Sequence, residues 1–238
     1  MKSDQFSQHI SRGFNAELEH LRNEVLRMGG MVENHLDIAI EAIVAGDSDL
    51  GLAVAGKDHL INQMEVDIDE ECSRILAIRG PAAADLRLIV AVIKTITDLE
   101  RVGDEAQKIG YLASHLASSQ LPSGQYLELS ELGEHVKKML HDSLDAFSRL
   151  DVKDALLVVE EDKLVDEEYD RILRQCISLM MEDSHTIRRF MDVSWVARAL
   201  ERIGDHAKNI SEYVIYMVHG KDIRHLKLEE VRQEIGAD

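Results

Sequence analysis

Apolar and small residues recur along this chain at alternating spacings of three and four, which is the period of an α-helix with one buried face. One such stripe comprises Val92, Ile96, Leu99, Gly103, Ala106, Gly110, Ala113 and Ala117. A second stripe of matching residue types comprises Val193, Ala197, Leu200, Gly204, Ala207, Ser211 and Val214. Helix-forming residues dominate the composition, and only 2 prolines interrupt the 238 residues. The pattern predicts an all-α protein whose long helices pack along these stripes.

The two stripes belong to a repeat that runs through the chain. The phrase Glu-Arg-Val-Gly-Asp, from Glu100 to Asp104, returns as Glu-Arg-Ile-Gly-Asp, from Glu201 to Asp205. Cys72 and Cys176 also stand at equivalent positions, within apolar helical patterns that predict buried, reduced thiols. The offset between equivalent residues changes only where a turn is expected, because loops tolerate insertions better than helices do. The repeat therefore predicts two similar structural units.

Each half is expected to form three helices. The predicted helices run from Phe14 to Ala45, Asp47 to Ile78, Ala82 to Ser118, Tyr126 to Leu150, Asp151 to Met181 and Ser184 to His219. Asp47 and Asp151 are the predicted N-caps, because an aspartate side chain accepts hydrogen bonds from the free backbone N–H groups that open a helix. The fold class that follows is two tandem, similar three-helix bundles.

Turn signals place the domain boundaries. We expect a first bundle at residues 1–118, a linker at 119–125, a second bundle at 126–219 and a C-terminal tail at 220–238. Gly80 and Pro81 mark a turn inside the first half, and the segment from Ser118 to Gly124 has the composition of a linker. The tail alternates charged residues with apolar ones such as Ile223 and Val231, so it is either a short packed helix or a disordered end.

Charge and hydropathy exclude two classes of partner. The chain has 45 acidic and 27 basic residues, and its formal net charge of −18 repels the phosphate backbone of nucleic acid. No apolar stretch approaches the ~20 residues that cross a bilayer, and the N-terminus lacks the apolar core of a signal peptide. We therefore expect a cytoplasmic protein that binds no nucleic acid and reaches a membrane only through its partners.

No catalytic motif is visible in the sequence. A phosphate-binding loop of the P-loop type and a Gly-x-Ser-x-Gly nucleophile motif are both missing, so we predict that the protein is not an enzyme. Phe190 and Trp195 are interpreted as packing residues. Met180, Met181 and Met191 are interpreted as gap-filling residues near the end of a bundle.

The repeated phrase carries the candidate chemistry. Glu100 and Asp104 are acids four residues apart on one helical face, an arrangement that costs an isolated helix about 0.2 to 0.5 kcal/mol. Glu201 and Asp205 repeat it in the second half. A bound cation would reverse the sign of that energy, and carboxylate oxygens suit hard cations such as Mg²⁺, Mn²⁺, Ca²⁺ or iron. The alternative is an acidic, solvated helix face that binds nothing.

The second helix of each half adds polar residues of its own. In the first half they are Asp58, Asn62, Glu65 and Asp69. In the second half only Asp162 and Asp166 remain acidic, because Tyr169 and Leu173 occupy the later positions. If the second and third helices of a half are neighbours, oxygen ligands from both helices converge on one cation.

Segments spread over nearly the whole chain share one resemblance. They are His9 to Glu19, Met28 to Glu33, Asp85 to Leu88, Met180 to Ser184 and both Glu-Arg-x-Gly-Asp phrases. Together they resemble the PhoU family of phosphate-specific transport system accessory proteins. The resemblance implies two three-helix bundles, a homodimer and a regulator without enzymatic activity. It implies as partners the ATPase subunit of the phosphate ABC transporter and the phosphate sensor histidine kinase, and as function the repression of the phosphate-starvation response and of high-affinity phosphate uptake.

The same resemblance assigns a role to the repeated acids. In the PhoU family these phrases are a metal-binding signature, which implies Glu100, Asp104, Glu201 and Asp205 as ligands of a divalent or iron-class cation. Further candidate ligands are Asp98, Asn62, Glu65 and Asp166. Asp98 is equivalent to Ala199, so we expect unequal sites with weaker binding in the second half. Two other interpretations stay open, a metal storage or redox bundle and a structural adaptor that needs no metal.

Overall fold

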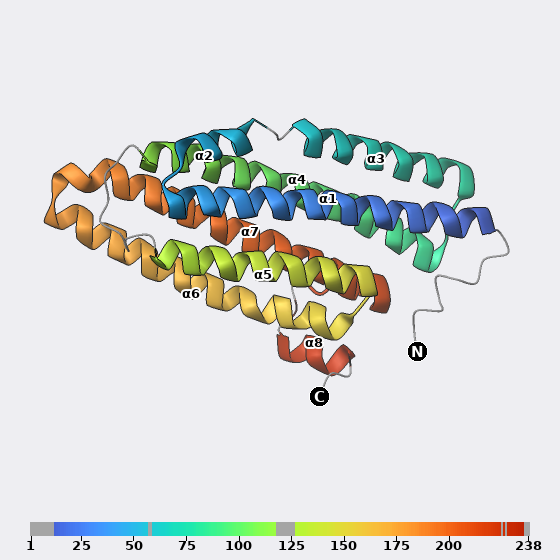
Figure 1. The fold of residues 1–238 in the computed structure, drawn as a ribbon. Coiled ribbons are helices and arrows are strands. Elements are labelled where there is room, and N and C mark those ends of the chain that lie inside the picture. The colour runs from blue at the N-terminus through green and yellow to red at the C-terminus, as the bar shows by residue number, and fades with distance from the viewer. Residues whose placement is uncertain (1–11, 57–58, 118–126, 225, 227, 236–238) are drawn as a thin grey trace.

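The computed structural model describes residues 12–56, 59–117, 127–224, 226 and 228–235, and no β-strand occurs among them (Figure 1). The first half contains α1 (Arg12–Ala45), α2 (Ser48–Ala55), α3 (His59–Arg79) and α4 (Ala83–Ala117). The second half contains α5 (Leu127–Arg149), α6 (Val152–Glu182), a 3₁₀ turn (Ser184–Thr186), α7 (Ile187–His219) and α8 (Leu228–Ile235). The all-α fold class is confirmed, and no helix in the described part of the chain is long and apolar enough to span a membrane.

The predicted helix from Asp47 to Ile78 is wrong as a single element, because it is divided into α2 and α3. The backbone N–H of Gly56 donates to the carbonyl oxygen of Leu52 at 3.2 Å and closes the last turn of α2. The equivalent position in the second half is Glu160, a good helix former, and α6 continues through it without a break. The proposed ligand Asp58 and the linker at 119–125 lie outside the described residues.

The predicted N-caps are confirmed in both halves. Asp47 Oδ1 accepts hydrogen bonds from the backbone N–H groups of Asp49 and Leu50, both at 3.0 Å. Asp151 Oδ1 does the same for Lys153 at 2.9 Å and Asp154 at 3.2 Å. These bonds satisfy backbone donors that have no partner inside the helix, and they fix where α2 and α6 begin.

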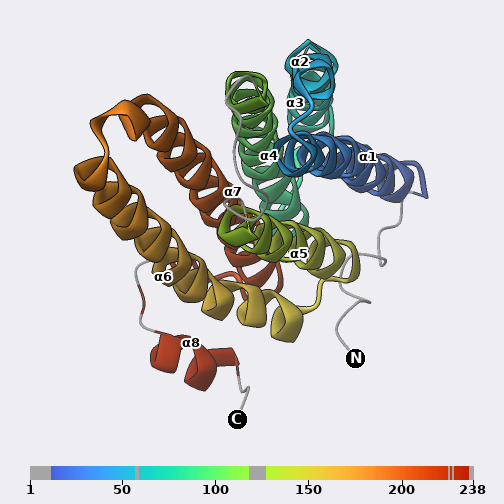
Figure 2. The same ribbon diagram turned by 60° about the vertical axis from the view of Figure 1, so that its left-hand side comes forward.

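The two bundles pack against each other along α4 and α7, which lie side by side at the centre of the molecule (Figure 2). α1 and α3 flank α4 on one side, and α5 and α6 flank α7 on the other (Figure 2). α1 also contacts α5, so a single hydrophobic core continues from one half into the other. The two tandem bundles are therefore joined by an extensive internal interface.

The C-terminal tail is a packed helix over its described residues. Val231 of α8 is 1 % exposed, and Ile223, just before α8, is 5 % exposed. Arg232 forms an ion pair with Glu160 of α6, with Nη2 and Oε1 2.6 Å apart. Of the two sequence-based alternatives for this segment, the structure selects the packed helix.

Two helices approach each other closely at Gly51 of α2 and Gly110 of α4. A Cβ atom added to Gly110 would lie 2.6 Å from the backbone oxygen of Gly51, and one added to Gly51 would lie 2.4 Å from the oxygen of Gly110. At Gly204, by contrast, the nearest atoms to an added Cβ belong to side chains, Val165 at 3.2 Å and Val136 at 4.0 Å. Backbone atoms cannot rotate away, so α2 lies directly on α4 only because both positions are glycine.

We predict that Gly110→Ala lowers the free energy of unfolding by about 1–3 kcal/mol, since α2 must move off α4 to make room for the methyl group. The control is Gly30→Ala, at an exposed position in α1 where nothing lies within 4 Å of an added Cβ. That variant should gain up to about 1 kcal/mol from helix propensity. Urea unfolding followed by circular dichroism measures both, and equal effects in the two variants would contradict the contact.

Candidate cation sites on the two bundles

Four carboxylates of the second bundle lie close enough to perturb one another. Glu201 and Asp205 on α7 face Asp162 and Asp166 on the neighbouring helix α6. Burial, together with the charge of Asp205, raises the pKa of Glu201 to about 7. Desolvation and the neighbouring acids also raise the pKa values of Asp166 and Asp205. The cluster is therefore electrostatically unfavourable for four negative charges, as a cation-binding cluster is when it holds no ion.

Two basic residues of α7 partly neutralise this cluster. Arg198 Nη1 donates to Glu201 Oε1 at 2.7 Å, and Lys208 Nζ donates to Asp162 Oδ2 at 2.5 Å. Burial lowers the pKa of Lys208, but the hydrogen bond with Asp162 and its charge outweigh burial and give a net increase. Both contacts leave part of the carboxylate surface for another ligand.

One carboxylate oxygen of the cluster fits a cation directly. Glu201 Oε2 is buried and has no hydrogen-bond partner among the described residues. A buried carboxylate oxygen without a partner is costly, and a hard cation would satisfy it. No three His, Cys, Asp or Glu side chains in the described part of the chain are arranged to hold a metal by themselves. Binding would therefore require the carboxylates to move together around the ion.

The first bundle presents the same acids in a different electrostatic setting. Glu100 and Asp104 are partly buried on α4, and α3, which contacts α4, carries the partly buried Glu65 and the exposed Asn62. In the first bundle, neutral residues occupy the positions equivalent to Arg198 and Lys208. Thr97, equivalent to Arg198, donates to the oxygen of Ile93 at 3.1 Å, and Gln107, equivalent to Lys208, donates to the oxygen of Ala55 at 2.8 Å. The first bundle thus lacks both basic residues that neutralise the second.

Asp98 lies apart from the other proposed ligands. It is 7 % exposed and faces α7, where its Oδ1 is 2.6 Å from His206 Nδ1 and accepts a hydrogen bond from Asn209 at 3.2 Å. Asp98 and Glu100 are two positions apart in the helix, so the two side chains point to opposite sides of α4. His206 is 8 % exposed and belongs to this contact between the bundles.

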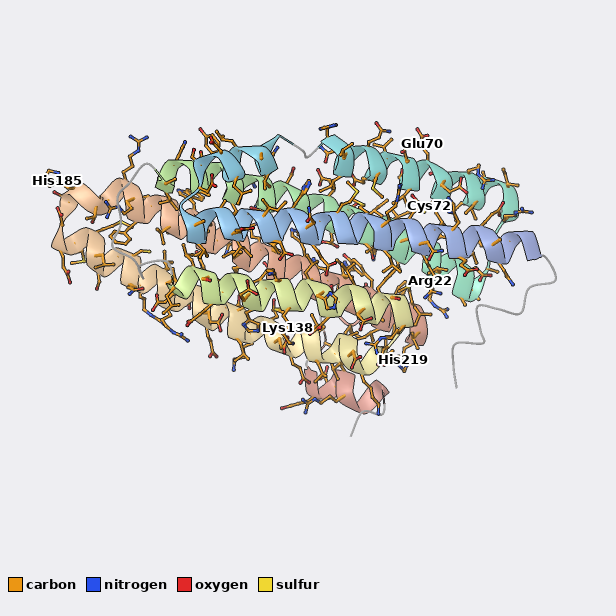
Figure 3. The ribbon with its side chains drawn as sticks, viewed as in Figure 1. Arg22, Glu70, Cys72, Lys138, His185 and His219 are labelled. Carbon is orange, nitrogen blue, oxygen red and sulfur yellow. The ribbon has the colours of Figure 1, made fainter. Side chains whose placement is uncertain are left out.

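The cysteines offer no metal or redox chemistry. Both are free and buried, as predicted, and burial raises the pKa of the Cys72 thiol to about 12 and of the Cys176 thiol to about 11. Figure 3 shows Cys72 on the side of α3 that faces α1, while Glu70 points outward from the same helix. Buried thiols with raised pKa values are poor nucleophiles and poor ligands.

The sequence reading missed a set of exposed apolar residues on the second bundle. Phe190 is buried as expected, but Trp195 is 57 % exposed, Met181 83 % and Met191 41 %, so their interpretation as packing residues is wrong. The signal was present in the helical period. Trp195 is two residues from Val193 of the buried stripe and therefore points away from it.

Glu212, another acidic residue of α7, makes the free energy of unfolding depend on pH. Burial raises the pKa of Glu212 from 4.5 to about 7, although Lys208 and Arg224 act in the opposite direction. The folded state then binds the proton more tightly than the unfolded state, so the native state loses stability as pH rises from about 4.5 to about 7. Glu212→Gln removes that loss and should be more stable than the wild type by on the order of 2–3 kcal/mol at about pH 8.

At about pH 4 the glutamate is protonated in both states, and the two proteins should be equally stable. Urea unfolding at both pH values measures the difference. A stability gain of the same size at both values would show that the effect comes from packing and not from the proton.

Comparison with known proteins finds the same repeat that the structure shows. The PhoU domain model matches residues 25–113 and 129–214, one region in each bundle. The phosphate-specific transport system accessory protein PhoU homolog of Pseudomonas aeruginosa is 47 % identical over 235 residues, which cover 99 % of this chain and 97 % of the relative. The PhoU protein of Escherichia coli is 48 % identical over 231 residues, covering 97 % and 95 %.

Two solved structures share the fold. The crystal structure of PhoU from Pseudomonas aeruginosa superimposes with a TM-score of 0.85 at 49 % identity, covering 87 % of this chain and 100 % of that one. The phosphate transport system regulatory protein PhoU from Streptococcus pneumoniae gives a TM-score of 0.82 at 29 % identity, covering 88 % and 98 %. With a family match in both bundles and close relatives along nearly its full length, this chain belongs to the PhoU family.

Proposed function

We propose that this protein is a cytoplasmic negative regulator of the phosphate-starvation response and of high-affinity phosphate uptake. It binds the ATPase subunit of the phosphate ABC transporter and the phosphate sensor histidine kinase, and it works as a homodimer. Cations held by the carboxylates of the two bundles bias which partner is bound. The observation that carries this proposal is the full-length similarity to phosphate-specific transport system accessory proteins in a chain that repeats the Glu-Arg-x-Gly-Asp phrase.

Each bundle supplies its own set of oxygen ligands. In the first bundle Glu100 and Asp104 would hold the cation, with Asn62 and Glu65 approaching from α3. In the second bundle Glu201, Asp205 and Asp166 would hold it, and the unpartnered Oε2 of Glu201 supports this site. When bound, the cation supplies positive charge that ties two helices of a bundle together. The protein residues contribute ligand oxygens and helix positions, with no chemical reaction.

The two sites should differ in affinity. Arg198 and Lys208 already contact carboxylates of the second cluster, and an incoming cation must compete with them. The first bundle has Thr97 and Gln107 at these positions, so a cation bound there does not compete with a basic residue at either position. We therefore expect tighter cation binding at Glu100 and Asp104.

Signalling by this protein requires two states with different partner affinities. A cation that draws α3 toward α4, or α6 toward α7, changes the surface that these helices present. A ligand shifts such an equilibrium only by its differential affinity for the two states. Cation binding would therefore change the ratio of affinities for the transporter and the kinase.

Metal content tests the cation sites directly. We predict that protein purified without chelator or nickel contains a divalent or iron-class metal, and that Glu100→Ala with Asp104→Ala removes the larger share of it. Glu201→Ala with Asp205→Ala should remove the smaller share. Elemental analysis by mass spectrometry measures this.

The matched control is Asp67→Ala with Glu70→Ala, two exposed acids on α3 that should leave the metal content unchanged. A folded Glu100→Ala, Asp104→Ala variant with full metal content would exclude the first site. The absence of metal from the wild type as well would favour a structural adaptor, and oxygen consumption by iron-loaded protein would favour the redox bundle.

Partner binding tests the regulatory role. We predict that the purified protein binds the ATPase subunit of the phosphate transporter and the cytoplasmic part of the sensor kinase in pull-downs at high phosphate. The ATPase subunit of an unrelated ABC transporter serves as the control. Adding the metal found by elemental analysis should change the two affinities by different factors. If neither partner binds, this function is wrong even though the family assignment stands.

A further inference from the structure

A cavity of about 720 Å³ lies between the C-terminal half of α4 and the N-terminal half of α7, where the two bundles meet near the end of α2. Its apolar lining includes Ala55, Leu112 and Ala199, with Tyr111 and Trp195 as aromatic residues. None of the proposed cation ligands lines it. The cavity is therefore separate from both cation sites.

Its aromatic residues are unusually open to solvent for an apolar lining. Trp195 is 57 % exposed and Tyr111 is 52 % exposed, and the Tyr111 ring packs against His115 with 4.4 Å between ring centroids. Ile187 and Met191, which precede Trp195 at helical spacing on α7, are 45 % and 41 % exposed and extend the apolar surface beyond the cavity. Tryptophan, tyrosine and methionine are residue types enriched at protein–protein contacts.

The rim of the cavity is basic, on a chain whose net charge is −18. Lys108 and Arg202 both contact Glu105, at 2.9 Å and 2.5 Å, and Arg198 reaches from the rim to Glu201 at 2.7 Å. Asp192 is the second acid in the lining. Three basic and two acidic side chains leave the lining with one net positive charge (3 − 2), which beside an apolar centre favours a ligand that combines an apolar group with negative charge.

The repeat provides a counterpart of this cavity, formed by the other ends of α4 and α7. There Lys94 replaces Trp195, Asp98 replaces Ala199 and Tyr213 replaces Leu112. These larger or polar side chains contact one another: Asp98 bonds His206, and Lys94 lies 5.3 Å from the centroid of the Tyr213 ring. Side chains thus occupy, at the counterpart, the space that stays open in the cavity.

The chain's own tail also covers the counterpart. Ile223, just after α7, is buried, and Asp222 and Arg224 flank it in sequence. Hydrogen bonds from Arg224 and, to a smaller extent, the charge of Lys94 lower the pKa of Asp222 to about 2. Arg224 also lies within electrostatic reach of Tyr213. The segment from Asp222 to Arg224, with a buried aliphatic side chain beside an acid, therefore lies near this counterpart position.

We propose that the cavity, extended by Ile187 and Met191, is the docking site for a partner-protein segment that inserts an aliphatic or aromatic side chain next to an acidic residue. This inference rests on the proposed function, in which the protein acts through protein partners. The apolar side chain packs between Trp195 and Tyr111, and the acid approaches Lys108, Arg198 and Arg202. The tail segment against the counterpart provides the precedent for a peptide as the occupant.

The test replaces both aromatic residues, in the variant Trp195→Ala with Tyr111→Ala. Both side chains are more than half exposed, so the variant should fold, which thermal unfolding checks. The partner that uses this cavity should bind the variant with an affinity roughly tenfold or more below that of the wild type. The matched control is Leu157→Ala with Ile78→Ala, which removes two side chains of 58 % and 64 % exposure outside the cavity lining and should bind as the wild type does.

Hydrogen exchange of the unmodified complex gives a second measurement that needs no variant. Peptides covering residues 105–115 and 187–202 should become protected when the partner binds. Binding of a partner with unchanged affinity in the double variant and no protection there would overturn the docking site while leaving the proposed function intact. If the wild type binds neither partner, the proposed function fails and this inference fails with it.

A small anion is the competing occupant, and Trp195 reports on it because it is the only tryptophan in the chain. Titration with ATP and with inorganic phosphate, followed by tryptophan fluorescence, should give no saturable change. A saturable change with ATP, combined with normal partner binding by the double variant, would assign the cavity to a nucleotide and overturn the proposal.

Discussion

The packing of α4 against α7 is the constraint on which the rest of the structure depends. The small-residue stripes face neighbours within each bundle, with Gly110 against α2 and Gly204 against α6, whereas the faces that α4 and α7 turn toward each other bury ionisable groups as pairs. Asp98 with His206 and Glu105 with Arg202 are such pairs, and each joins one bundle to the other. The repeated acids Glu201 and Asp205 are directed elsewhere, toward Asp162 and Asp166 of α6 within their own bundle.

The duplication supplies one backbone geometry twice, and single substitutions give the two copies different chemistry. Arg198 and Lys208 contact carboxylates of the second acidic cluster, whereas Thr97 and Gln107 at the same positions of the first half bond to backbone oxygens. At the contact between bundles, Asp98 closes one end, whereas Ala199 leaves space at the other. The repeated acids are thus the proposed ligands in both halves, and the positions that differ between the halves set how each cluster and each end of the contact behaves.

Arg198 connects the acidic cluster of the second bundle to the proposed docking site. Its guanidinium lines the cavity and also holds Glu201, so the cation cluster and the proposed docking site share one side chain. A cation that displaced Arg198 from Glu201 would release its charge toward the rim of the cavity. This gives a short physical path by which cation occupancy would alter partner affinity, through one charged group and without a change of fold.

The sequence by itself determined the helices, both aspartate caps, the duplication and the acid pairs, because periodicity, capping and repeats are local properties that neighbouring residues encode. It also contained signals that were overlooked, such as the helix-breaking Gly56 and the position of Trp195 away from the buried stripe. Only the tertiary structure decided that Asp98 pairs with His206, that Glu201 has an unpartnered buried oxygen and that a cavity remains beside Ala199. These features depend on which helix faces meet and on the side chains that each face presents, and residues far apart in the chain fix them together.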